Sequence, residues 1–157
     1  MRWVWVTVLT VVAALLQVSF MGALRIGGVV PNLALILVVC LVVWGTASEA
    51  LFAAVLAGLL LDVAGTGTFG LAISSLVVIC LGLVALRQLG ADGHAWPVRL
   101  GMVALATMAW AVIHVAAIGM NNFGSIAVWR IIITEVIVNC LMGLLFVEGF
   151  IGGARTV

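Results

Sequence analysis

Long apolar runs separated by short polar turns make up most of this chain. Residues 3–21 and 69–86, for example, contain no Asp, Glu, Lys or Arg. A transmembrane helix needs about 20 predominantly apolar residues. Of the 157 residues, 67% are hydrophobic and 7% are charged, whereas a soluble domain carries about 25% charged residues. Because this composition cannot supply a water-facing surface, we expect an integral membrane protein.

The runs predict a single integral membrane domain over residues 1–157, an all-α bundle of six transmembrane helices. We expect spans at about 3–21, 29–44, 49–64, 69–86, 98–118 and 127–146. The third run is short, because about sixteen residues reach only about 24 Å of a hydrocarbon core that is about 30 Å thick. If it is re-entrant, five spans remain. The first run lacks a small-x-small cleavage site, so we expect it to be retained.

One carboxylate stands at the end of the third run, in Gly58-Leu-Leu-Leu-Asp62, just before the glycines Gly65, Gly67 and Gly70. A charge at the centre of a transmembrane helix costs about 2.5–3.5 kcal/mol on insertion scales. Asp62 therefore either belongs to a functional polar surface or lies at the interface and caps the glycine turn. The glycines permit a tight turn and close approach of another helix.

Small residues recur every four positions in the third run, which is typical of close helix contact. They form two series, Ala50, Ala54, Gly58 and Ala53, Ala57. We expect such stripes to supply docking faces for other membrane helices. The competing interpretation is that alanine is simply common in membrane helices.

The arginines indicate an orientation. Six crossings place both termini on one side, together with Arg2, Arg87, Arg99 and Arg155. The other side then holds Arg25 and Arg130. Because cytoplasmic loops carry the excess of Lys and Arg, both termini are expected in the cytoplasm.

This orientation gathers the polar residues of the spans in the outer half of the bilayer. They are Gln17, Asn32, Asp62, Ser74, Ser75, His114, Arg130 and Glu135. Intramembrane polar groups usually face the bundle interior or a wet cavity and often carry function. We therefore expect an outward-facing polar groove or partner surface, with Asp62, Arg130 and Glu135 as its charges.

Structural interpretations compete with this one. Arg130 is close enough to a helix end to extend its charge to the headgroups, whereas Glu135 lies deeper and needs a partner. His114 is typical of a packing residue, because no second ligand lies three or four positions away. No metal or cofactor is expected, since the cysteines are single and lie inside apolar runs: Cys40, Cys80 and Cys140.

The order of these features resembles a known family. An early arginine and an apolar first run with Gln17 precede Pro31-Asn32-Leu33, and Gly58-x-x-x-Asp62 precedes the three glycines. Over about residues 2–90 this resembles the MreD family of bacterial rod-shape membrane proteins. The family usually has an aspartate where Asn32 stands. The resemblance implies a fold similar to that of the substrate-binding subunits of energy-coupling-factor vitamin transporters.

The resemblance implies a non-enzymatic inner-membrane scaffold or adaptor of the cell-wall elongation machinery. Its partners would be MreC, the actin-like MreB and the peptidoglycan glycosyltransferase and transpeptidase. The alternative is a vitamin-like small-molecule binding subunit of a transporter, with Trp110, His114 and Glu135 lining a pocket. An intramembrane enzyme is disfavoured, because motifs such as His-Glu-x-x-His and Gly-x-Ser-x-Gly are absent. The net charge of +1 offers no basic face for nucleic acid.

Overall fold

The computed structural model describes residues 2–19, 28–65, 68–90, 95–119 and 123–154, with side chains as far as residue 146. These residues form six helices and no strand: α1 (Arg2–Ser19), α2 (Leu33–Trp44), α3 (Ala47–Ala64), α4 (Leu71–Gln88), α5 (Trp96–Ile118) and α6 (Ile126–Ala154). Five of them are long and apolar enough to cross a membrane; α2 is the shorter one. The all-α membrane bundle expected from the sequence is confirmed.

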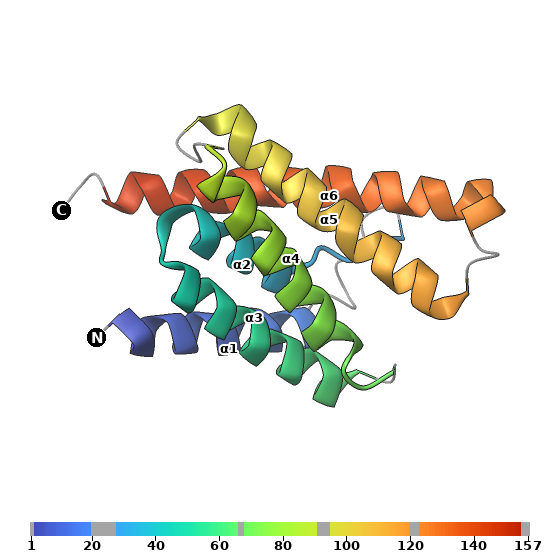
Figure 1. Cartoon of the computed structure of the whole chain (residues 1–157), viewed down its shortest axis with the longest axis horizontal. Helices are drawn as coiled ribbons and strands as arrows, with labels where there is room; N and C mark the ends of the chain where they lie inside the picture. The colour runs from blue at the N-terminus through green and yellow to red at the C-terminus, as the bar shows by residue number, and fades with distance from the viewer. Residues whose placement is uncertain (1, 20–27, 66–67, 91–94, 120–122, 155–157) are drawn as a thin grey trace.

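Successive helices alternate in direction, so α1 begins and α6 ends on the same side of the bundle (Figure 1). The pairs α3 and α4, and α5 and α6, pack as antiparallel neighbours. α1 and α6 form opposite edges of the bundle, and α2 lies between them (Figure 1).

The short helix α2 is the centre of the fold. It packs against each of the other five helices. Ala34, Leu35 and Val38 are fully buried, and a helix that is apolar on all sides is a buried one. Its 12 residues rise only about 18 Å. Since protein covers most of α2, and only the side with Leu37, Cys40, Leu41 and Trp44 is partly open, its length does not have to match the bilayer.

The sequence had led us to expect that the third helix is the short one. The short helix is instead α2. The side chain of Asn32 caps α2 by accepting the Leu35 N–H at 3.0 Å, so the helix begins at Leu33 and Pro31 lies outside it. A capping box extends α3, because Thr46 N–H donates to Glu49 at 2.9 Å while the Glu49 N–H donates to the Thr46 hydroxyl at 3.3 Å. α3 reaches 18 residues as a result.

The small residues of α3 lie inside the bundle. Ala50, Ala53, Ala54 and Ala57 are 0% exposed, and Gly58 is buried. α3 packs here against α1, α2 and α4. The expectation that these stripes form docking faces for partner helices is wrong, because the chain's own helices cover them.

Candidate functional site

Asp62 caps the start of α4. Its two carboxylate oxygens accept the backbone N–H groups of Ala72 at 2.9 Å and Ile73 at 3.1 Å. The first N–H groups of a helix have no partner within the helix and carry its positive dipole end, so a carboxylate there is stabilising. Of the two interpretations of Asp62, the structure shows a capping one, with the α4 amides as donors.

Gly58, one turn before Asp62, lets α3 and α4 approach closely enough for that cap. A Cβ added at Gly58 would lie 2.5 Å from the Cα of Ile73, closer than any real contact. Gly65 ends α3, and Gly70 precedes α4 with φ of 92°, a left-handed conformation that favours glycine. Gly67 lies outside the described residues.

A second group of polar side chains fixes the start of α2. The backbone N–H of Asn32 donates to Asn139 Oδ1 of α6 at 2.8 Å, and Asn139 Nδ2 donates to Thr107 Oγ1 of α5 at 3.2 Å. Gln17 of α1 accepts the Ala34 N–H at 3.0 Å. Asn32, Thr107 and Asn139 are buried, so the links from the start of α2 to α5 and α6 lie inside the bundle, whereas Gln17, which makes the link to α1, is partly exposed.

The remaining candidates on α5 and α6 do not join a common site. His114 Nδ1 lies 2.9 Å from the Trp110 carbonyl oxygen, and the two rings stack with centroids 4.0 Å apart. Arg130 is exposed and Glu135 is partly buried. Within the described residues, no hydrogen bond or ion pair links Asp62, Arg130 and Glu135 to one another.

At the end of the bundle opposite Asp62 and Asn32, arginines converge on the turn between α2 and α3 (Figure 1). Arg2 of α1 contacts Glu49, with Nη2 3.0 Å from Oε2. Arg87 of α4 donates to the carbonyl oxygens of Val42 at 2.6 Å and Gly45 at 3.2 Å, which satisfies the end of α2. We call this turn, residues 44–49, together with the arginines around it, the arginine turn.

A third arginine completes the arginine turn. The guanidinium carbon of Arg99, in the first turns of α5, lies 5.7 Å from the centre of the Trp44 ring, within the range of a cation–π contact. Three helices, α1, α4 and α5, therefore place cations around one turn, whose ion-paired carboxylate is Glu49.

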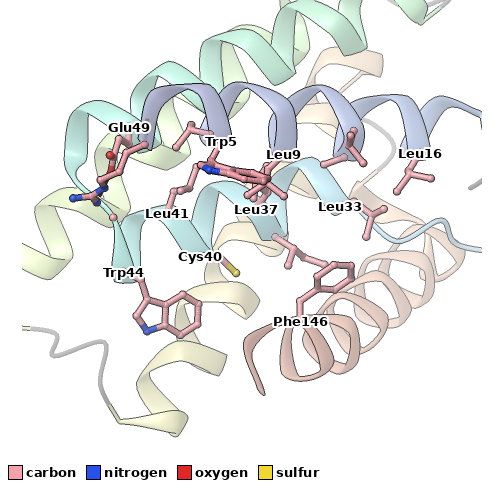
Figure 2. Close-up of a pocket in the computed structure, with 16 residues that line it drawn as sticks. Trp5, Leu9, Leu16, Leu33, Leu37, Cys40, Leu41, Trp44, Glu49 and Phe146 are labelled. Atoms are coloured by element: carbon pink, nitrogen blue, oxygen red, sulfur yellow. Dashed lines mark hydrogen bonds and ion pairs between the residues drawn. The ribbon is translucent and has the colours of Figure 1, made fainter. Parts of the chain in front are cut away.

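An apolar groove of about 330 Å³ runs along α1 and α2 from the arginine turn. Figure 2 shows Trp5 and Leu9 of α1 on one wall, Leu37 and Cys40 of α2 on the other, and Phe146 of α6 beside them. Trp44 and Glu49 stand at one end of the groove, and Leu16 and Leu33 at the other (Figure 2). Arg2, which contacts Glu49, lines the same end as Glu49. We call this the α1/α2 groove.

A scan against protein-family models, a search of curated proteins and a search of solved structures find no match to this chain.

The sequence pointed to some of these groups and missed others. The cap by Asp62 was one of two interpretations, whereas the partnership of Asn32 with Asn139 spans 107 positions and leaves no local signal. The third span was expected to begin at Glu49, although Thr46 followed by Glu49 three positions later is a capping signature that predicts a start at Ala47. Nothing in the sequence marked the α1/α2 groove, because its lining is ordinary lipid-compatible side chains.

Proposed function

We propose that this chain is a non-enzymatic scaffold or adaptor in the bacterial inner membrane, of the MreD kind, that supports cell-wall elongation. The observation that carries the proposal is the use of its polar side chains. Asp62, Gln17 and Asn32 bond backbone amides at the starts of α4 and α2. They hold helices at fixed positions, which is what a rigid platform for other membrane proteins requires.

The lipid-exposed faces are where partner helices would dock. On α6, Ile133, Ile137, Leu141 and Leu145 follow one another every four residues and are all more than half exposed. By the resemblance, the partners are an MreC-like bitopic protein, actin-like MreB and the wall-synthesis enzymes. Packing against such a helix needs no further polar group.

Cross-linking in cells tests this proposal. A photoreactive amino acid is placed at Ile137 of α6, or at Val78 of α4 as the matched exposed position on another helix. Co-expressed MreC-like protein is expected to cross-link strongly at one helix face and at background level at the other. Background cross-linking at both positions, and at Leu81 and Leu141, would contradict a direct adaptor role.

The proposed orientation puts both termini in the cytoplasm. The start of α1, the end of α6 and the arginine turn lie on the same side of the bundle (Figure 1), in keeping with the positive-inside rule. Reporter fusions before Met1 and after Val157 should both report the cytoplasm. Fusions on opposite sides would overturn the orientation.

The vitamin-binding alternative predicts a ligand near Trp110 and His114. The centroids of these rings lie 4.0 Å apart and their planes are tilted by 31°. An increase in melting temperature with a water-soluble vitamin, lost in Trp110→Ala, would favour that function over the scaffold.

A further inference from the structure

The α1/α2 groove has the length of one membrane leaflet. Beyond Arg2 at its end, the apolar lining on α1 runs from Trp5 to Leu16, and the lining on α2 runs from Leu33 to Trp44. Each stretch rises about 17 Å at 1.5 Å per residue. Half of a hydrocarbon core about 30 Å thick is about 15 Å. The groove therefore spans one leaflet, from the interface at the arginine turn to the middle of the bilayer. The acyl chains of that leaflet lie beside it.

Apolar side chains line the groove along its length, and charged side chains, Arg2 and Glu49, stand only at its end at the arginine turn. An occupant therefore has to be apolar along most of its length and polar at one end. A single acyl chain is much narrower than a helix, and it can follow an apolar channel lined by Leu9, Leu37 and Cys40 without leaving a polar group unpaired.

The end of the groove at the arginine turn carries positive charge. The Arg2 side chain is 70% exposed, and only its Nη2 contacts Glu49 among the described residues. A guanidinium has five N–H donors, so donors remain for a phosphate oxygen. Arg87 and Arg99 lie around the same turn. Three cations and one paired carboxylate favour an anionic headgroup over a zwitterionic one.

We propose that the α1/α2 groove binds one acyl chain of an anionic phospholipid, whose phosphate contacts Arg2. Trp5 and Trp44 flank that headgroup, at the interfacial depth that indole rings prefer. This site does not depend on the scaffold role proposed above, and its test requires no partner protein.

Native mass spectrometry of the full chain tests the site. The delipidated protein in detergent is titrated with palmitoyl-oleoyl phosphatidylglycerol or with phosphatidylcholine of the same chains. One phosphatidylglycerol per chain is expected, bound about fivefold more tightly than phosphatidylcholine. Arg2→Gln should bring the two affinities within about twofold, and Arg2→Lys should retain the preference. Arg130→Gln, an exposed arginine at the other end of the bundle, should behave as wild type.

Filling the groove tests the acyl-chain part. Ala13 lines the groove, and Ala13→Phe should abolish binding of both lipids. Ala116→Phe, at an exposed position on α5, should leave binding unchanged. Retained lipid in Ala13→Phe, or equal affinity of the wild type for the two lipids, would overturn the proposal. So would a dimer that Ala13→Phe dissociates, because the groove would then belong to an interface between two copies.

A measurement on the wild-type protein tests the groove without relying on the correct folding of these variants. Cys40 lines the groove, whereas Cys140 does not, and both are free and partly buried. Phosphatidylglycerol should slow maleimide alkylation of Cys40, read by peptide mass spectrometry, and leave the rate at Cys140 unchanged. Equal protection of both cysteines, or protection of neither, would contradict an acyl chain in the groove.

Discussion

Gly58 and Asp62 act as a pair. The missing side chain of Gly58 brings the start of α4 within reach, and the Asp62 carboxylate then accepts two of its amides. The sequence singled out both residues, Asp62 as the carboxylate at the end of an apolar run and Gly58 as a member of a series of small residues. It could not supply the donors, Ala72 and Ile73, since their position depends on how the turn between the helices closes.

Replacing Gly58 by alanine should separate α3 from α4. The new Cβ would meet backbone atoms of Ile73 at 2.5 Å and 2.8 Å, and backbone cannot turn aside as a side chain can. We expect a loss of roughly 1–3 kcal/mol in the free energy of unfolding. Gly82→Ala on α4 is the matched control, because its Cβ meets nothing within 4 Å. Equal stability of the two variants in detergent unfolding would contradict the close contact.

Removing the Asp62 carboxylate should weaken the start of α4. Asp62→Ala leaves the Ala72 and Ile73 amides without an acceptor, at a cost of about 1–2 kcal/mol. Asp62→Asn keeps one acceptor oxygen and should lose about half as much. Hydrogen exchange at residues 71–74 measures the effect directly. Unchanged exchange in Asp62→Ala would show that the cap contributes nothing.

The helix α2 shows where prediction of elements from this sequence ends. Six helices follow from hydropathy, because backbone groups in lipid must be satisfied within each segment. The start of α2 does not, since an apolar stretch from Val29 to Trp44 reads as one continuous span. The cap by Asn32 and the acceptor supplied by Asn139 fix that start, and the second of these comes from a helix at the far end of the sequence.

Replacing Asn139 should loosen α2 at its first turn. Asn139→Leu removes the acceptor of the buried Asn32 N–H and the donor to Thr107, and an unsatisfied buried group costs about 1–3 kcal/mol. Faster hydrogen exchange is expected at residues 32–36, although the substitution lies on α6. Thr134→Val is the control on the same helix, because the Thr134 hydroxyl donates only to the Arg130 carbonyl oxygen of its own helix. Exchange that changes on α6 alone would contradict the network.

The molecule as a whole is polarised between its two ends. Gln17, Asn32 and Asp62 bond helix starts at one end, and Arg2, Arg87 and Arg99 surround the arginine turn at the other. The grouping of these polar residues could be predicted from topology alone. Their structural role could not be predicted. We expected them to share a groove, whereas most of them bond backbone groups, because helix ends present unpaired amides and carbonyls.

Arg2 and Glu49 tie the first helix to the third at the arginine turn. In a double-mutant cycle of Arg2→Gln and Glu49→Gln, we expect the double variant to lose less stability than the sum of the two single variants. The Glu49 side chain is only 5% exposed, so the coupling should exceed that of an ordinary surface pair. Additive losses in the two single variants would show that the contact contributes no interaction energy.

The contact that positions α2, between Asn32 and Asn139, has a consequence for biogenesis. Ribosomes deliver the chain from its first residue onward, yet the Asn32 amide finds its acceptor only on Asn139. Until α6 has left the translocon, the short second helix lacks one of the contacts that fix its position. Docking of α2 is thus a late event that follows insertion, and truncation before α6 should leave an intermediate that cellular quality control recognises.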